Sequence, residues 1–447
     1  MMFHDYRKIL LSVLFALTVL SSSAQYTVTG GSKGAPLLAV DDTRNRLQVW
    51  MVYGMNNVRI SYTSSGGAVK WYRYQVKALE PESIAFSTEG NTTYISDMKE
   101  GYGYFVEEEG TLARYIWIID YSQHAFTMNS LTVASGDCIS VRLSGEPAVT
   151  NMQYYTPSGA MVSLQRKFLV SYKTLKWSDD SKSFSNITEV DSLLGNPYAK
   201  SVAAPLCDTE FTLSGDMFGE HFGVGQTMTT DTYQAVAVEV HADTTVVVDN
   251  SKNLDTSTGD ALSAPVSVHF TAHANDPVAS LYVWKIYNKE TGEDTPLLRY
   301  TGPEVDYTFA TAGTFVAALE VSSRNGDCSD DSNTFTFEIS VSFLDVPNVF
   351  SPGTSPGVND EFKVAYKSLI KYEIWIFNRW GNQLWHSTNP AEGWNGKNGN
   401  KYVSPGVYFY VINAKGSDGI QYHKKGSISI LRSKTINDQV ESSNGTN

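Results

Sequence analysis

The chain has 447 residues, a length that fits about three or four domains. Its hydrophobic content of 42% and charged content of 18% exclude a mainly disordered chain. Its net charge of −13 repels phosphate backbones and anionic membranes, so we expect no nucleic-acid partner.

The first 24 residues predict a secretory signal peptide. Arg7 and Lys8 supply the positive region, residues 9–20 form an apolar run, and the small residues 22–24 provide a cleavage site. The run is too short to span a bilayer comfortably, which takes about 20 residues. A non-cleaved anchor is the alternative. We find no later candidate, so we expect an exported chain without a transmembrane segment in its mature form.

Residues 26–432 have the pattern of strands and turns. Short aromatic and β-branched runs alternate with Gly, Asn, Asp, Ser and Pro, and no long helical periodicity interrupts them. No repeat of fixed period is visible, which argues against a solenoid or a propeller. The sequence therefore predicts an all-β chain of tandem β-sandwich domains.

The boundaries of the expected domains are marked less clearly than the strand pattern. We place an immunoglobulin-like sandwich at residues 25–121, in which Trp71 and Tyr102 fit the buried tryptophan and the corner tyrosine of that fold. An exposed aromatic platform for sugar rings is the alternative for these residues. A second β-sandwich is expected at 122–241.

The third domain, at residues 242–343, resembles a PKD-type β-sandwich. The resemblance is carried by three runs: Ser267-Val268-His269-Phe270, Tyr282-Val283-Trp284-Lys285-Ile286, and Ala312-Gly313-Thr314-Phe315-Val316-Ala317-Ala318-Leu319-Glu320-Val321. The Phe-Gly-Asp-Gly turn usual after the PKD tryptophan is absent. An Ig-like/PKD-like fold is what the resemblance implies.

The most informative stretch is residues 348–432. Its runs, in order, are Asn348-Val349-Phe350-Ser351-Pro352, Tyr372-Glu373-Ile374-Trp375-Ile376-Phe377-Asn378-Arg379-Trp380-Gly381-Asn382, Gly393-Trp394-Asn395-Gly396, Ser404-Pro405-Gly406-Val407-Tyr408 and Lys424-Lys425-Gly426-Ser427-Ile428. That order resembles the gliding-motility-associated C-terminal domain, the type B sorting domain of the Bacteroidetes type IX secretion system. We place this domain at 344–432 and expect a disordered tail at 433–447.

The resemblance implies a C-terminal β-sandwich that directs type IX secretion and outer-membrane attachment. Its implied partners are the secretion machinery and a PorP/SprF-like outer-membrane protein. Its implied location is the cell surface, the outer membrane or the medium, reached through the periplasm. We assign the recognition role only to Asn378, Arg379, Trp380, Gly381, Gly393, Trp394, Gly396 and Gly406. The alternative for the tryptophans is that they are core and turn residues.

The sequence departs from this family in two places. Family members usually carry a Pro-Asn-Gly-Asp-Gly loop, whereas residues 352–357 here retain Pro and Gly but lack its Asn and Asp. A calcium role for that loop is therefore not expected. The tail after Arg432 extends beyond the point where family domains commonly stop.

We find no catalytic motif, so we expect a protein that is not an enzyme and has no cofactor other than a candidate calcium ion. The chain has no Gly-x-Ser-x-Gly elbow, no His-Glu-x-x-His pair and no phosphate-binding glycine loop. Oxygen-rich loops between strands can hold calcium, and the best candidate ligands are Asp327, Asp330 and Asp331. Three cysteines cannot form a closed disulfide framework, although Cys138 and Cys207 could pair.

The leading hypothesis is a secreted, cell-surface-associated multi-domain β protein whose upstream domains act in adhesion or partner binding. One alternative is a structural or docking subunit of the type IX secretion or gliding apparatus. A second is a surface protein that binds or cleaves glycans.

Overall fold

The computed structural model describes residues 26–247, 262–354 and 357–432, so the predicted signal peptide and tail lie outside the described residues. In this part of the chain, regular structure is almost entirely strand. The exceptions are one α-helix, α2 (Met217–His221), and two 3-10 helices, η1 (Tyr121–Gln123) and η2 (Pro197–Ala199). The all-β prediction is confirmed. Among the described residues, no helix is long and apolar enough to cross a membrane.

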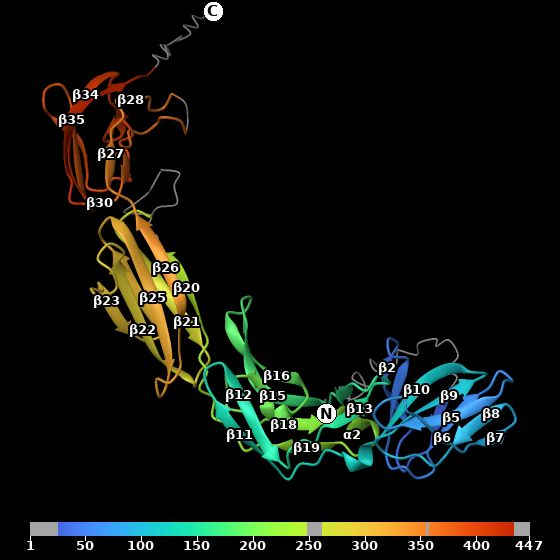
Figure 1. Cartoon of the computed structure of the whole chain (residues 1–447). Helices are drawn as coiled ribbons and strands as arrows, with labels where there is room; N and C mark the ends of the chain where they lie inside the picture. Colours follow the sequence, from blue (N-terminus) through green and yellow to red (C-terminus); the bar gives the residue numbers. More distant parts are fainter. Residues whose placement is uncertain (1–25, 248–261, 355–356, 433–447) are drawn as a thin grey trace, which may run out of the picture. The chain divides into compact units, whose positions relative to one another are not determined.

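The chain divides into two compact units (Figure 1). Unit 1 comprises Met1–Thr174 and Asn186–Gln234, and unit 2 comprises Leu175–Ser185 and Ala235–Asn447.

The first sandwich of unit 1 has a four-stranded and a six-stranded sheet. In sheet order, the smaller contains β1 (Tyr26–Thr29), β4 (Arg59–Thr63), β8 (Thr92–Ile95) and β7 (Ser87–Glu89). The larger contains β2 (Leu37–Asp42), β3 (Leu47–Val52), β10 (Thr111–Asp120), β9 (Gly103–Glu108), β5 (Val69–Tyr74) and β6 (Glu82–Ile84).

Trp71 on β5 is buried between these sheets, and its indole N–H donates to Thr93 Oγ1 at 2.9 Å. It therefore has the core position expected of the sandwich tryptophan. The corner tyrosine is Tyr104 rather than Tyr102. The hydroxyl of Tyr104 accepts a 2.7 Å hydrogen bond from the backbone N–H of Lys99, five residues upstream, whereas the ring of Tyr102 lies beside Arg73.

The second group of strands forms three small sheets. In sheet order they are β11 (Ser130–Gly136), β12 (Ser140–Glu146) and β17 (Ser201–Ala203); β13 (Met152–Tyr155) and β14 (Met161–Leu164); and β16 (Ser183–Leu194), β15 (Lys167–Ser178), β18 (Thr212–Gly215) and β19 (Gln226–Thr229).

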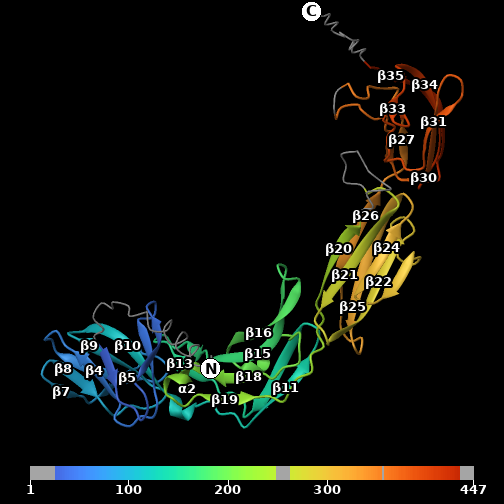
Figure 2. The ribbon, with the colours of Figure 1, turned by 180° about the vertical axis from the view of Figure 1, so that it is seen from behind.

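One hydrophobic cluster joins this group to the first sandwich. Trp117 on β10 and Met51 on β3 pack in the same cluster as Met152 and Tyr154 on β13 and Phe218 on α2. Figures 1 and 2 show β13 and α2 beside the end of the first sandwich. The two domains of unit 1 therefore share apolar packing as well as a covalent connection.

The third sandwich belongs to unit 2. In sheet order, its sheets contain β20 (Val240–Val247), β21 (Val266–Ala274) and β24 (Glu304–Phe309); and β23 (Leu298–Thr301), β22 (Ala279–Asn288), β25 (Gly313–Ser323) and β26 (Ser329–Ile339). Trp284 on β22 and Phe270 on β21 meet between the sheets with ring centroids 5.3 Å apart.

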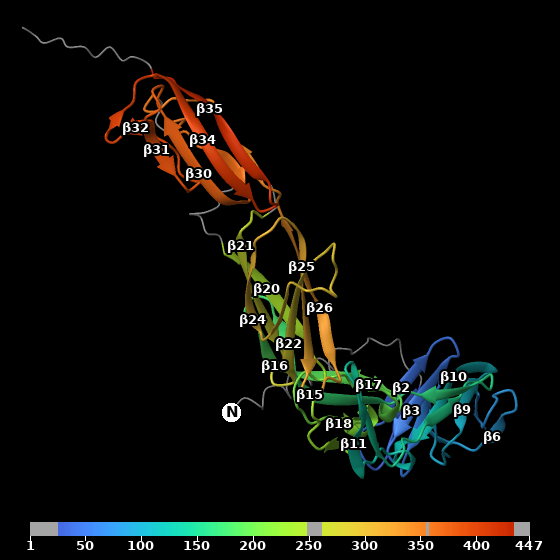
Figure 3. The same cartoon turned by 90° about the vertical axis from the view of Figure 1, so that its left-hand side faces the viewer.

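The last domain is built on a five-stranded sheet. Its order is β28 (Val349–Phe350), β35 (Gln421–Ile430), β34 (Gly406–Gly416), β30 (Leu369–Phe377) and β31 (Gln383–Ser387). Smaller pairs are β27 (Phe343–Asp345) with β29 (Ala365–Lys367), and β32 (Lys397–Asn398) with β33 (Lys401–Tyr402). Figure 3 shows β30, β34 and β35 side by side.

Alternate residues of this sheet point to opposite faces. Ile374, Ile412 and Ile428 point into the core, where Leu344 of β27 and Tyr366 of β29 also pack. The other face carries the residues between them, many of which are exposed. This second face is called the open face below.

Candidate recognition surface

The turn between β30 and β31 presents two of the expected recognition residues to solvent. Trp380 is 71% exposed, and the guanidinium carbon of Arg379 lies 4.2 Å from the centre of its ring. The side-chain oxygen of Asn378 accepts 3.0 Å hydrogen bonds from the backbone N–H groups of Trp380 and Asn382, and Gly381 has a φ of +86°. Asn378 and Gly381 therefore shape the turn that presents Arg379 and Trp380.

Other expected recognition residues lie inside the domain. Trp394 is fully buried in the core, and its indole N–H donates to the carbonyl of Lys397 at 2.9 Å. A Cβ at Gly393 would lie 2.6 Å from the side chain of Lys363, and one at Gly396 would lie 2.7 Å from the ring of Pro352. These three positions therefore specify the fold.

Gly406, the last of the eight, is an exposed residue at the start of β34. Gly406 offers a partner only its backbone, whereas Arg379 and Trp380 expose their side chains. The structure does not gather all eight residues on one surface.

The open face contains an apolar surface that motif matching missed. Phe377 on β30 pairs with Phe409 on β34, and Trp375 pairs with Val411. Val407, Phe409 and Val411 are 53%, 45% and 37% exposed. These five residues, Trp375, Phe377, Val407, Phe409 and Val411, are the apolar stripe. The signal for it is the alternation along 406–416, because every second residue must face away from the core.

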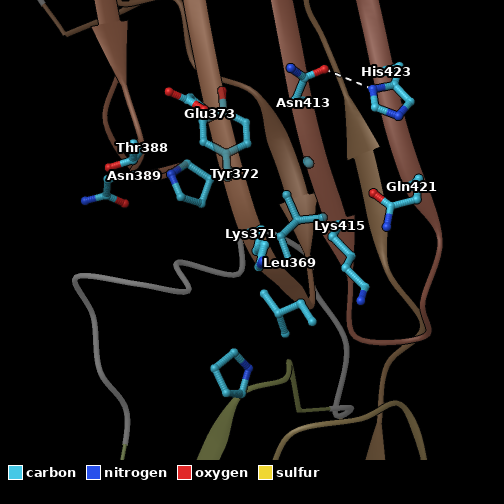
Figure 4. Close-up of a pocket in the computed structure, with 14 residues that line it drawn as sticks. Leu369, Lys371, Tyr372, Glu373, Thr388, Asn389, Asn413, Lys415, Gln421 and His423 are labelled. Atoms are coloured by element: carbon cyan, nitrogen blue, oxygen red, sulfur yellow. Dashed lines mark hydrogen bonds between the residues drawn. The ribbon is translucent and has the colours of Figure 1, made fainter.

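A hollow lies on the same face beyond the apolar stripe (Figure 4). Its volume is about 880 Å³, and its lining includes Lys371, Glu373, Asn413, Lys415, Gln421 and His423. The ring nitrogen Nδ1 of His423 lies 2.9 Å from Oδ1 of Asn413 (Figure 4). Outside the lining, Nε2 of His386 lies 2.9 Å from Oε1 of Glu373. The hollow is polar where the stripe is apolar.

Of the candidate calcium ligands, Asp327 lies in the turn after β25, and Asp330 and Asp331 lie on β26. The carboxylate of Asp330 accepts 3.0 Å hydrogen bonds from the backbone N–H groups of Val240 and Ser332, one on each oxygen. Within 26–247, 262–354 and 357–432, no three His, Cys, Asp or Glu residues form a group that could hold a metal ion. Asp327 and Asp331 as further calcium ligands remain a prediction.

Two other sequence expectations concern the loop that contains Pro352 and the pairing of the cysteines. The Asp360 carboxylate accepts hydrogen bonds from the N–H groups of Gly353 at 2.9 Å and Gly357 at 2.6 Å. Cys207 carries a free thiol. The suggested pairing of Cys138 with Cys207 is therefore wrong.

Comparison with protein families identifies two of the domains. Residues 344–430 match the CHU_C Type IX secretion signal domain, and residues 130–230 match Fn3_FA, a fibronectin type III domain. The predicted sorting domain is thus confirmed. Such a signal implies sorting by the type IX system and a location at the cell surface or outside the cell.

Solved structures resembling the chain include a tetra-tandem repeat from the extending region of a large adhesion protein, with 14% identity, 91% and 99% of the two chains covered and a TM-score of 0.19. The FN1-FN3 domains of chicken CNTN1 have 12% identity, with 68% of this chain and 98% of that chain covered and a TM-score of 0.22. Sidekick-1 immunoglobulin domains 1-5 have 10% identity, with 91% of this chain and 81% of that chain covered and a TM-score of 0.24. No curated protein matches the chain.

Proposed function

We propose that the protein is a non-enzymatic surface protein held at the outer membrane by its C-terminal domain. The domain engages the type IX machinery for export and a PorP/SprF-like protein for attachment. The three upstream domains act in adhesion or partner binding. The observation that carries the proposal is the apolar stripe exposed on a domain that matches a secretion signal.

The physical argument starts from the cost of exposed apolar groups. Contiguous apolar side chains on a soluble domain mark interaction sites, and aromatic residues and Arg are enriched in the cores of such interfaces. The stripe has two aromatic residues at its centre, and the turn of Arg379 and Trp380 follows β30 directly. This surface supports docking better than the buried motif residues do.

Charge supports the same surface. Residues 344–432 contain ten Lys and Arg against six Asp and Glu, in a chain whose net charge is −13. The domain is therefore basic in an acidic protein. A partner with an apolar centre and an acidic rim would complement it and associate faster at low salt.

Deletion of residues 344–447 tests the role of the domain in export. The expected result is retention of the truncated protein in the periplasm, measured by fractionation and by protease digestion of intact cells. Normal arrival of the truncated protein at the surface would contradict the proposal. Co-purification of the intact protein with an outer-membrane complex at fixed stoichiometry would instead indicate a subunit of the apparatus.

Substitutions on the open face test the docking surface itself. Phe409→Ser combined with Trp380→Ser should reduce surface attachment, while the thermal unfolding of the protein changes little because both side chains are exposed. The matched control is Phe343→Ser on β27, whose side chain is 49% exposed on a different sheet. Equal surface attachment of the two variants would exclude the stripe as the docking site.

A further inference from the structure

The hollow on the open face contains an unusual pair of like charges. Lys371 on β30 and Lys415 on β34 are directly paired across the two strands, so both side chains leave the same face of the sheet. Neither ammonium group has an ion-pair partner among the described residues. Like charges in this position are unfavourable, and a bound anion would remove the repulsion.

The remaining polar groups of the hollow are suited to hydroxyl groups. Asn413 and Gln421 carry side-chain amides, which both donate and accept hydrogen bonds, as sugar hydroxyls do. Thr388 and Asn389 line the hollow from the segment after β31. Figure 4 shows Asn413, Gln421 and Lys415 along the same side of the hollow.

The lining also has an apolar part, which includes Ile370 on β30. Leu369, Pro265 and Pro390 contribute to it. Leu369 and Pro265 come from different domains of unit 2, which are tied here by a 3.1 Å hydrogen bond from the N–H of Ala264 to Oγ of Ser368. The position of Pro265 against the sheet is therefore supported by a buried contact.

We propose that this hollow binds an anionic saccharide, with Lys371 and Lys415 holding its acidic group and Asn413 and Gln421 its hydroxyl groups. A volume of about 880 Å³ lies within the range of about 300–1,000 Å³ that is usual for small-molecule sites. It exceeds what a bare phosphate ion needs. The acidic group is a phosphate or a carboxylate, because both pair with two ammonium groups.

An acidic peptide is a weaker match for the hollow. Peptides gain much of their affinity by adding a strand to a free sheet edge. Here Asn413 and Lys415 lie on β34, whose backbone groups are paired with β30 on one side and β35 on the other. The part of β30 that lines the hollow, Leu369–Glu373, pairs with β34 alone, so the acidic hexapeptide in the experiment below tests strand addition at this edge. Lys371, Lys415 and Asn413 project from the face of the sheet, and recognition by their side chains favours a compact ligand rich in hydroxyl groups.

Calorimetric titration of the purified full-length chain tests the site. The probes are digalacturonic acid, glucose 1-phosphate, glucose, inorganic phosphate and an acidic hexapeptide. We expect binding of at least one of the two anionic sugars, with an affinity that falls as salt rises and is at least tenfold above that for glucose. Lys371→Gln and Lys415→Gln should each weaken this binding at least tenfold, because each removes a charge-assisted hydrogen bond.

The matched control is Lys425→Gln, which removes one positive charge from the same face at the position paired with Val411, outside the hollow. It should leave the affinity within about twofold. Failure of both anionic sugars to bind would overturn the proposal. It would also be overturned if Lys425→Gln weakened the binding of the anionic sugar as much as Lys371→Gln and Lys415→Gln do. Inorganic phosphate binding as tightly as the sugars, or the peptide binding more tightly, would also overturn it. These outcomes leave the export experiment above unaffected, since that experiment measures location.

Discussion

At the scale of single residues, the motif that identifies the C-terminal domain separates into two roles. Trp394 is buried and bonded to the backbone, whereas Trp380 is exposed on a turn. The sequence motif contains both tryptophans. The spacing of residues in the motif does not indicate which of them faces the core.

Substitution of the two tryptophans should separate stability from recognition. Trp394→Ala should lower the free energy of unfolding of the C-terminal domain by about 3–5 kcal/mol, as large-to-small core changes do. Trp380→Ala should change it by less than about 0.5 kcal/mol. Calorimetry measures both, and a similar loss for the two variants would contradict the assignment.

Glu108, at the end of β9, holds the loop between β4 and β5 through hydrogen bonds to its carboxylate. Hydrogen bonds from the Ser64 hydroxyl and the Tyr62 hydroxyl, followed by those from the Gly67 N–H and the Ser65 hydroxyl, lower the pKa of Glu108 from 4.5 to about 2. The ionised carboxylate thus fixes the loop between β4 and β5.

The lowered pKa predicts a pH dependence of stability. The contribution of Glu108 should be fully present above about pH 4.5 and should be lost as pH falls towards 2, because the folded state then binds its proton less readily than the unfolded state. Hydrogen exchange of residues 64–67 measures it. Exchange in Glu108→Gln should be faster than in the unsubstituted protein at pH 7, and the two should converge near pH 2. Glu109→Gln is the control, and a constant difference at every pH would contradict the prediction.

At the scale of elements, turns and strand faces decide which surface is available. The alternation along β34 places Ile412 in the core and Phe409 and Val411 on the open face. In the hairpin of β30 and β31, Phe377 lies on the open face, whereas Ile374 and Ile376 lie in the core. Successive side chains of a strand point to opposite faces. Phe377 is one position from Ile376 and three positions from Ile374, so it points to the face opposite both.

Two glycines beside the β32–β33 hairpin form a matched pair. Gly396 and Gly399 have φ values of +72° and +61°, but only at Gly396 would a Cβ meet the ring of Pro352. Both Ala variants should be destabilised by about 1 kcal/mol from backbone strain. In Gly396→Ala, overpacking against Pro352 should lower the free energy of unfolding by about 1 kcal/mol or more in addition. Urea unfolding measures the difference, and equal midpoints would show that Pro352 moves freely.

At the scale of the whole molecule, unit 1 depends on a buried ion pair. Nη1 of Arg166 lies 2.7 Å from Oδ2 of Asp216, and the hydroxyl of Tyr121 donates to Oδ1 of the same carboxylate at 2.7 Å. Tyr121 follows the last strand of the first sandwich, and Asp216 caps α2 in the second domain. The network therefore ties the two domains together.

Asp216→Ala should lower the free energy of unfolding of unit 1 by about 3–5 kcal/mol, because Arg166 would remain buried without its counter-charge. Replacing both residues, as in Arg166→Met with Asp216→Leu, should recover much of this loss. Calorimetry and limited proteolysis of the full chain provide the measurement. A double variant no better than Asp216→Ala would indicate that the hydrogen bonds to Tyr121 and α2 dominate.

Much of this architecture was predictable from local pattern. Strand alternation and turn residues predict an all-β chain, and ordered motifs around Trp380 and Trp394 predict the C-terminal domain, because both depend on neighbours in sequence. The corner tyrosine was misplaced by two residues, since Tyr102 and Tyr104 both lie near the start of β9 and share its face pattern. The hydrogen bond from Lys99 and the full burial of its side chain identify Tyr104, whereas Tyr102 is partly exposed beside Arg73.

The sequence by itself determined the fold class and the identity of the domain that directs export, since both are recorded in residue order. The tertiary structure alone decided which residues a partner or ligand can reach. The apolar stripe and the Lys371–Lys415 pair come from strands that are distant in sequence. Their proximity is created by strand register, and register depends on the packing of the whole sheet.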